Sequence, residues 1–142
     1  MFALTMIVSL FSFSQSVITV NFTKTETLLL SGNYDYKKVL ELGDIKTQKI
    51  VNETKVINLD KMVTQYFVDD QLKGIYLIDD CKEEDGVYII TYSEVDLRNG
   101  KQIKTTQIVD TKENKSHYSW YWDGDEDTSY LIDEKVNTLT VK

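Results

Sequence analysis

An acidic run between two aromatic segments has the spacing of a chemical site. Four carboxylates fall at positions 1, 3, 5 and 12 of a loop: Asp123, Asp125, Asp127 and Glu134. Oxygen ligands at this spacing hold a hard cation such as calcium. The match is partial because Thr128 stands at position 6, where such loops need glycine for a sharp turn. The run therefore predicts either a calcium site or a solvated acidic turn, and no other cofactor is indicated.

An aromatic stripe flanks the acidic run. Its members are Tyr118, Trp120, Trp122 and Tyr130. If the segments on either side of a five-residue loop at 123–127 pair as a hairpin, all four rings share one face, with Trp120 opposite Tyr130. Aromatic rings offer much contact area at a low cost in conformational entropy. The stripe is therefore either the core of the sheet or a platform for a sugar ring or a small apolar ligand.

The single histidine and the single cysteine carry little chemistry. The same hairpin register places Asp133 opposite His117, but no nucleophile lies within the pattern, so we expect an ionic pair rather than a general base. Cys81 lies among carboxylates, which should raise its thiol pKa and lower its reactivity. A zinc site built from His and Cys is excluded. No spacing marks a catalytic pair among the 23 acidic residues.

The elements that position these residues are predicted to be strands. Val, Ile, Thr and Tyr contribute 49 residues, whereas Ala3 is the only alanine. The six glycines lie beside polar residues and between β-rich runs, where turns are needed. We predict strands at 17–23, 26–31, 36–42, 46–51, 54–59, 62–68, 74–79, 87–97, 101–109, 116–122, 128–133 and 136–141. Residues 59–67 also fit a helical stripe, and 79–86 is predicted to be a second acidic loop.

Two hairpins have a register that can be tested. For the segment around Asn99 and Gly100, apolar matching favours a bulged turn with Gly100 left-handed, which pairs Val95 with Ile103 and Ile90 with Ile108. For the second hairpin, three further pairs follow from the loop at 123–127: Tyr118 with Ile132, His117 with Asp133, and Ser119 with Leu131.

Long strands joined by hairpins predict an all-β antiparallel meander. Such a chain hides its edges by closing as a small up-and-down barrel or half-barrel of calycin type, or by stacking as a two-sheet sandwich. We favour the barrel or half-barrel because the hairpins from residue 74 onward are consecutive. No linker or repeat divides the chain, so residues 17–142 are expected to form one domain.

The first 16 residues have the pattern of a secretory signal. They carry no charged side chain, include an apolar run from Phe2 to Phe13, and end in small residues. The run is too short to span a bilayer. Residues 1–16 are therefore predicted to be a signal peptide, and the mature protein to be secreted or periplasmic.

The net charge of -7 and the single arginine, Arg98, make nucleic acid an unfavourable partner. The sequence predicts an exported, monomeric, non-enzymatic binding module for a small molecule or a macromolecule. The alternatives are a carbohydrate-active or other hydrolase that uses Asp and Glu, and a calcium-stabilised extracellular module.

Overall fold

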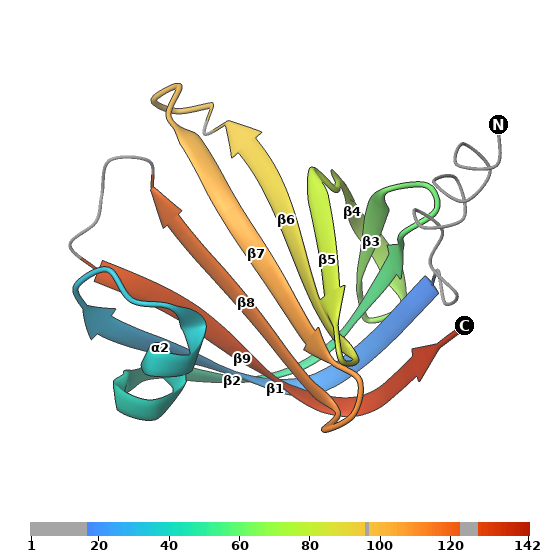
Figure 1. The fold of residues 1–142 in the computed structure, drawn as a ribbon, viewed down its shortest axis with the longest axis horizontal. Helices are drawn as coiled ribbons and strands as arrows, with labels where there is room; N and C mark the ends of the chain where they lie inside the picture. The colour runs from blue at the N-terminus through green and yellow to red at the C-terminus, as the bar shows by residue number, and fades with distance from the viewer. Residues whose placement is uncertain (1–16, 96, 123–127) are drawn as a thin grey trace, which may run out of the picture.

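The computed structural model describes residues 17–95, 97–122 and 128–142, with only the backbone given for 120–122. Nine strands and one short helix make up this part of the chain: β1 (Val17–Ser31), α2 (Tyr36–Leu42), β2 (Asp44–Asn58), β3 (Val63–Val68), β4 (Gln71–Leu77), β5 (Asp80–Glu84), β6 (Val87–Val95), β7 (Gln102–Asp110), β8 (Lys115–Trp122) and β9 (Thr128–Val141). The strands form one antiparallel sheet that curls strongly into an open half-barrel (Figure 1). The all-β prediction and its half-barrel form are confirmed, and the two-sheet alternative is not the architecture.

The strand order is β4-β3-β2-β1-β9-β8-β7-β6-β5, which places the first and last strands side by side in the middle. β4 and β5 are consecutive in the chain but form the two edges of the sheet. Because every pairing is antiparallel, β4 and β5 run in the same direction. The linker between them bonds to both halves, since Ile78 N donates to Met62 O (2.9 Å) and Asp79 N donates to Thr91 O (2.8 Å). The chain itself therefore joins the two edges across the opening.

The apolar core lies on the inner face of the curled sheet, toward the end where Val17 pairs with Lys142 through two backbone hydrogen bonds of 3.0 and 2.9 Å. Its fully buried side chains come from both halves of the sheet: Ile18, Val20, Phe22, Ile57, Ile90 and Val109. The opposite end of the inner face carries polar and aromatic side chains instead. The two ends of one concave surface therefore have different chemistry.

Residues 36–42 form α2, so the predicted strand there is wrong. The Asp35 side chain caps the helix by accepting from Lys38 N at 3.0 Å, and the backbone N–H of Gly43 closes it by donating to Val39 O at 2.8 Å. Val39 packs with Leu28 and Leu131 on the outer face of β1 and β9. An aspartate cap and apolar residues at helical spacing outweighed the strand propensity of this segment.

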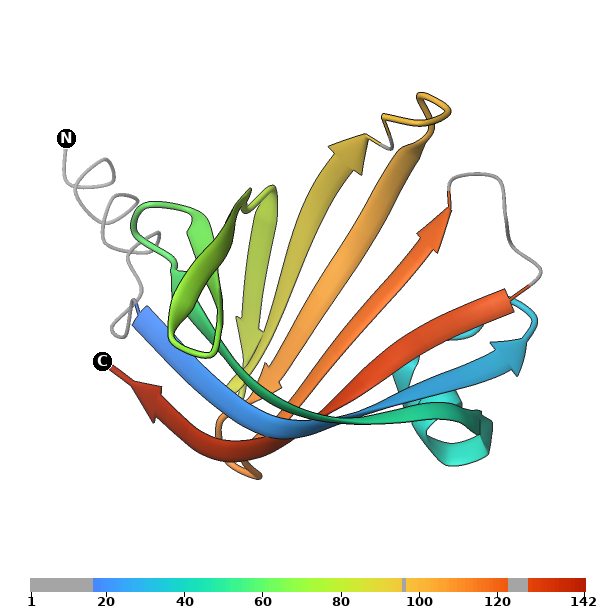
Figure 2. The same ribbon diagram turned by 180° about the vertical axis from the view of Figure 1, so that it is seen from behind.

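Three pairs of predicted short strands are continuous in the structure. Segments 17–23 and 26–31 join as β1, 46–51 and 54–59 as β2, and 128–133 and 136–141 as β9. Figure 2 shows these three as long curved strands that lie next to one another. Register shifts between Phe22 and Lys24 mark bulges rather than turns. A bulge bends a strand without ending it, which is why the polar interruptions were misread as loops.

The predicted register is right for one hairpin and wrong for the other. β8 and β9 pair Tyr118 with Ile132 and Trp120 with Tyr130, and the predicted His117–Asp133 and Ser119–Leu131 pairs are also confirmed. β6 and β7 instead pair Glu94 with Ile103 and Ile90 with Gln107, one residue from the prediction, although Gly100 is left-handed at φ 70° as expected. Apolar matching failed because Gln107 is a buried polar residue with partners inside the half-barrel.

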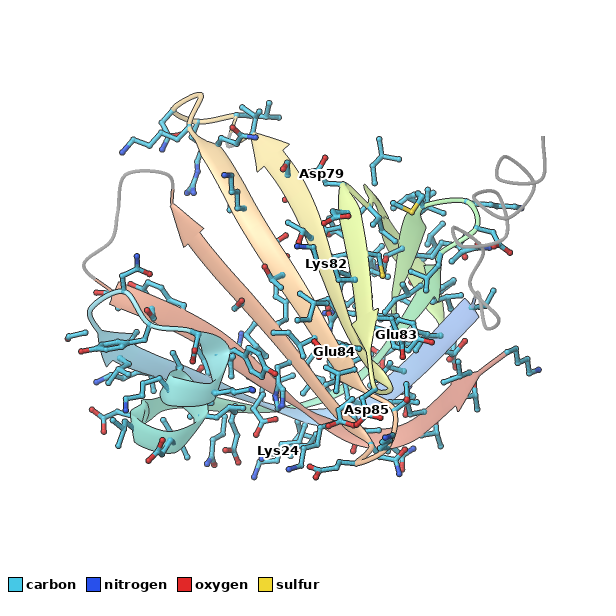
Figure 3. The ribbon with its side chains drawn as sticks, viewed as in Figure 1. Lys24, Asp79, Lys82, Glu83, Glu84 and Asp85 are labelled. Carbon is cyan, nitrogen blue, oxygen red and sulfur yellow. The ribbon has the colours of Figure 1, made fainter. Side chains whose placement is uncertain are left out.

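The acidic segment at 79–86 is not the loop that was predicted. Residues 80–84 form the edge strand β5, which pairs with β6 from Asp80–Thr91 to Glu84–Val87. Figure 3 shows Glu83, Glu84 and Asp85 along this edge and its end. Charged side chains on an edge strand oppose pairing with another chain. Among the described residues no helix is long and apolar enough to cross a membrane.

Candidate functional site

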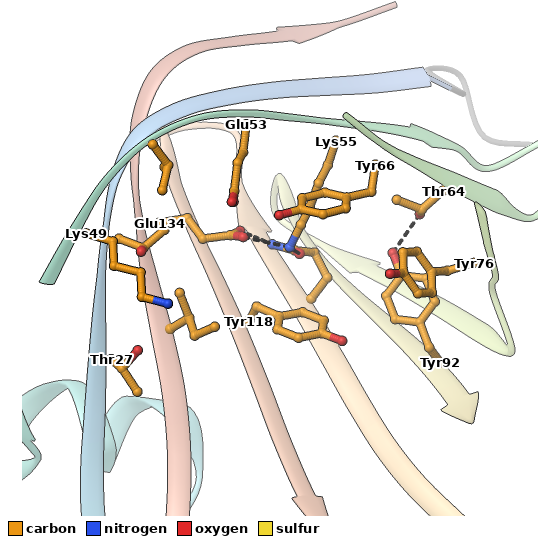
Figure 4. Close-up of a pocket in the computed structure, with 14 residues that line it drawn as sticks. Thr27, Lys49, Glu53, Lys55, Thr64, Tyr66, Tyr76, Tyr92, Tyr118 and Glu134 are labelled. Atoms are coloured by element: carbon orange, nitrogen blue, oxygen red, sulfur yellow. Dashed lines mark hydrogen bonds and ion pairs between the residues drawn. The ribbon is translucent and has the colours of Figure 1, made fainter. Parts of the chain in front are cut away.

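A pocket of about 300 Å³ opens on the inner face of the half-barrel above the apolar core. Figure 4 shows side chains from both halves of the sheet pointing into it. Its lining comes from every strand except β5: Thr25, Thr27, Lys49, Val51, Glu53, Lys55, Thr64, Tyr66, Tyr76, Tyr92, Gln107, Tyr118, Ile132 and Glu134. The curl of the sheet creates this site, because these residues are far apart in the sequence.

A buried ion pair lies in the pocket. Lys55 Nζ donates to Glu134 Oε2 at 2.6 Å and to Gln107 Oε1 at 2.7 Å. The second oxygen of Glu134 accepts from Gln107 Nε2 at 2.8 Å and from Ser116 Oγ at 2.7 Å. Glu134 is 3% exposed and Gln107 is 1% exposed, so these groups depend on one another in place of water. This satisfied network fixes the position of the Lys55 ammonium.

Aromatic rings surround that ammonium. Lys55 Nζ lies 4.3 Å from the centre of the Tyr118 ring and 5.6 Å from that of Phe22. A cation over an aromatic face is attracted by the electron-rich face of the ring. Lys55 therefore connects the polar pocket to the apolar core beneath it.

Four tyrosines form much of the pocket wall. Burial raises the pKa of Tyr118 to about 12, although a hydrogen bond with Thr105 acts in the opposite direction. Burial also raises the pKa of Tyr92, and it raises that of Tyr66 together with the neighbouring Glu53 carboxylate. At neutral pH the phenols of Tyr118, Tyr92 and Tyr66 therefore stay protonated, so each of these three can both donate and accept a hydrogen bond.

Side-chain contacts in the pocket wall span the opening between the two halves of the sheet. The hydroxyls of Thr64 on β3 and Tyr92 on β6 lie 2.6 Å apart in a buried hydrogen bond. The Tyr76 and Tyr92 rings meet edge to face with their centres 6.4 Å apart. These contacts hold together strands that share no backbone ladder, so the pocket walls keep a fixed spacing.

The predicted aromatic stripe contributes to this site in part. Tyr118 lines the pocket, whereas Tyr130 is half-buried and lies outside the lining. The backbone of Trp120 pairs with Tyr130 as predicted, but the side chains of Trp120 and Trp122 lie outside the described residues. Tyr118 both packs against the core and faces the pocket, so the choice between core and platform stays open.

Three of the four proposed calcium ligands lie outside the described residues, so the calcium site stays a prediction. These three are Asp123, Asp125 and Asp127. Glu134 is on β9, where both of its oxygens accept hydrogen bonds inside the pocket. Within residues 17–95, 97–122 and 128–142, no group of three or more His, Cys, Asp or Glu residues is placed to hold a metal ion.

His117 lies on the outer face of the sheet, away from the pocket. Its Nδ1 is 3.3 Å from Asp133 Oδ1, which agrees with the predicted pair, and its ring stacks on Tyr36 of α2 with centres 6.2 Å apart. Cys81 is half-buried on β5, and burial raises its pKa to about 11, with Asp80 and Glu83 adding to the shift. Neither side chain lines the pocket.

Of the site residues predicted from the sequence, Tyr118 and Glu134 line the pocket, and sequence reasoning missed the others that build it. Lys55 lies two residues from Ile57 and four from Val51, so all three share the inner face of β2. Once that strand was placed, an inward-pointing lysine could have been predicted. Gln107 gave no such signal because the chosen register turned it outward. The network needs four strands to assemble, and no local pattern encodes it.

No protein-family model matches the chain, and neither a curated protein nor a solved structure is significantly similar to it. The pocket must therefore be interpreted from its own geometry. Glu53 and Glu134 both line it, as a two-carboxylate hydrolase would need. Both oxygens of Glu134 accept internal hydrogen bonds from Lys55, Gln107 and Ser116.

Proposed function

We propose that this protein is an exported, non-enzymatic module that binds a small molecule in the pocket of the half-barrel. The observation that carries the proposal is the combination of an open pocket of about 300 Å³ with a fully bonded polar network inside it. Small-molecule sites are concave, largely preformed, and have a few polar groups fixed in position. A volume near the lower end of the usual range favours a compact ligand.

The structure of the network favours binding over catalysis. The Lys55 ammonium and the Glu134 carboxylate are held by each other and by Gln107 and Ser116. Groups that are held in this way keep fixed positions from which they can orient a ligand. Export stays a prediction from residues 1–16, which lie outside the described residues.

A fragment screen on the full chain tests the proposal. Ligand-observed NMR with mixed polar, aromatic and apolar fragments should give hits that disappear in a Thr27→Trp variant, because Thr27 lines the pocket and a tryptophan there fills its mouth. The matched control is Thr140→Trp, at an exposed position of β9 outside the lining. The proposal fails if no fragment of any class binds, or if every hit binds the Thr27→Trp and Thr140→Trp variants equally well.

A further inference from the structure

Hydroxyls are the commonest polar groups among the side chains that line the pocket. Seven of the fourteen lining side chains carry one: Thr25, Thr27, Thr64, Tyr66, Tyr76, Tyr92 and Tyr118. Only Val51 and Ile132 are aliphatic. A pocket for a fatty chain or another apolar ligand is lined mainly by hydrophobic side chains. Thr64 and Tyr92 already bond to each other. An apolar ligand would leave any remaining water-bonded hydroxyl without a partner, which is unfavourable.

The charges of the lining cancel. Two lysines, Lys49 and Lys55, face two glutamates, Glu53 and Glu134, so their formal charges sum to zero. A ligand with a net charge would give up its hydration in a half-enclosed space that offers no net countercharge. A neutral ligand avoids that cost. The charge balance therefore argues against a small anion and a small cation equally.

The remaining polar groups suit a ligand that donates and accepts in several directions. An ammonium has three N–H donors, and Lys55 gives two of them to Glu134 and Gln107, which leaves the third for a ligand oxygen or the Tyr118 ring. Glu53 is an acceptor beside Tyr66 (Figure 4). Aromatic faces such as Tyr118 provide flat area for the C–H side of a saturated ring.

We infer that the pocket takes a neutral, polyhydroxylated ring of monosaccharide size. Hydroxyls on such a ring exchange hydrogen bonds with the threonine and tyrosine hydroxyls, and the tyrosine rings cover its less polar face. The volume of about 300 Å³ corresponds to roughly ten waters at about 30 Å³ each, which suits one substituted ring rather than a long chain. This inference rests on the proposed function and names the ligand class of the same site.

NMR titration of the isotope-labelled full chain with three kinds of ligand tests the inference. The first is a panel of neutral sugars (glucose, galactose, mannose and N-acetylglucosamine), the second is glucose 6-phosphate, and the third is dodecanoate. At least one neutral sugar should bind saturably and shift signals of pocket residues, and its affinity should change less than about twofold when the salt concentration is raised, because a neutral ligand is not screened. Binding of dodecanoate or glucose 6-phosphate in the pocket without any neutral sugar overturns the inference.

A hydroxyl deletion provides the matched variant. Tyr66→Phe removes one pocket hydroxyl and should weaken sugar binding about two- to tenfold, the usual range for one neutral hydrogen bond, without weakening any binding of dodecanoate. The control is Tyr34→Phe, because Tyr34 is 47% exposed and outside the lining. Equal affinity of the sugar for both variants overturns the inference. Fragments that bind in the pocket while all sugars fail overturn it and leave the proposed function standing, whereas the absence of any pocket-dependent ligand overturns both.

Discussion

Two neighbouring acidic residues lie on opposite faces of the β8–β9 hairpin and have different surroundings. Glu134 points inward beside Ser116, and Asp133, one residue earlier, points outward beside His117. Glu134 is 3% exposed and its carboxylate is bonded only by groups of the pocket network. Asp133 is half-buried, and its carboxylate lies 3.3 Å from His117 Nδ1 and 2.6 Å from Lys135 Nζ.

The two faces also differ in what covers them. On the outer face α2 packs Val39 against Leu28 and Leu131. On the inner face nothing among the described residues fills the space above the ion pair, so the pocket stays open. Both faces thus bury an acidic side chain, but only the inner face combines it with room for a ligand. A buried charge therefore indicates a candidate binding site only where open volume lies next to it.

The largest effect is expected from breaking the inner pair. Lys55→Met leaves the Glu134 carboxylate buried with Ser116 and Gln107 but without a countercharge. We expect a loss of roughly 2–4 kcal/mol in the free energy of unfolding, somewhat below that of a fully enclosed pair because the pocket admits water. Urea unfolding measures it. The outer-face control, Lys135→Met, should cost less than about 1 kcal/mol because Lys135 is 45% exposed.

A double variant shows whether the loss comes from the unpaired charge. Lys55→Met combined with Glu134→Gln removes both charges and keeps the shape of the Glu134 side chain. The double variant should be more stable than the Lys55→Met single variant, and the coupling between the two sites should exceed about 0.5 kcal/mol. Strictly additive losses would contradict the assignment of a coupled ion pair.

A smaller effect is expected from loosening the outer face. Val39 is 2% exposed, and Val39→Ala removes methyl groups from the contact between α2 and the sheet. We expect a loss of about 1–2 kcal/mol, measured by urea unfolding, with ligand affinity in the pocket unchanged. Leu42→Ala is the control because Leu42 is 54% exposed and should change stability by less than about 0.5 kcal/mol. A change in pocket affinity with Val39→Ala would show that the two faces are not independent.

The difference between the two faces also determines which strand registers could be predicted from the sequence. Strand composition and the β8–β9 register were predictable because cross-strand pairs on that hairpin separate aromatic from polar side chains. The Ile90–Gln107 pair was not, because the assumption that apolar residues face one another fails where a glutamine is satisfied inside the half-barrel. Register from apolar matching is therefore least reliable next to a polar site.

The sequence analysis predicted neither α2 nor the pocket, and the physical reasons differ. Tyr36, Val39 and Leu40 have the spacing of a helical face, and Asp35 is a capping residue. The sequence therefore contained a local signal for α2, but the strand prediction gave more weight to β propensity. The pocket has no local signal. Lys55, Gln107 and Glu134 meet only because β1 and β9 pair in the centre of the sheet, which joins the two ends of the chain.

The smallest expected effect concerns the outer carboxylate and pH. Burial alone would raise the pKa of Asp133, but the neighbouring His117 and the hydrogen-bonded ammonium of Lys135 lower it below its usual 3.8. A carboxyl whose pKa is lower in the native state stabilises the fold above its unfolded pKa, and this contribution is lost as pH falls through the native value. The stability difference between the native sequence and Asp133→Asn should therefore shrink as the pH falls below about 4.

Urea unfolding at a series of pH values measures that difference. The control is Asp60→Asn, since Asp60 is exposed and forms no ion pair with the other described residues. Its difference from the native sequence should vary little over the same range. A difference for Asp133→Asn that stays constant or grows on acidification would mean that His117 and Lys135 do not stabilise the charged form. The outer face would then bury its carboxylate without compensation, unlike the inner face, where Lys55 and two further donors hold Glu134.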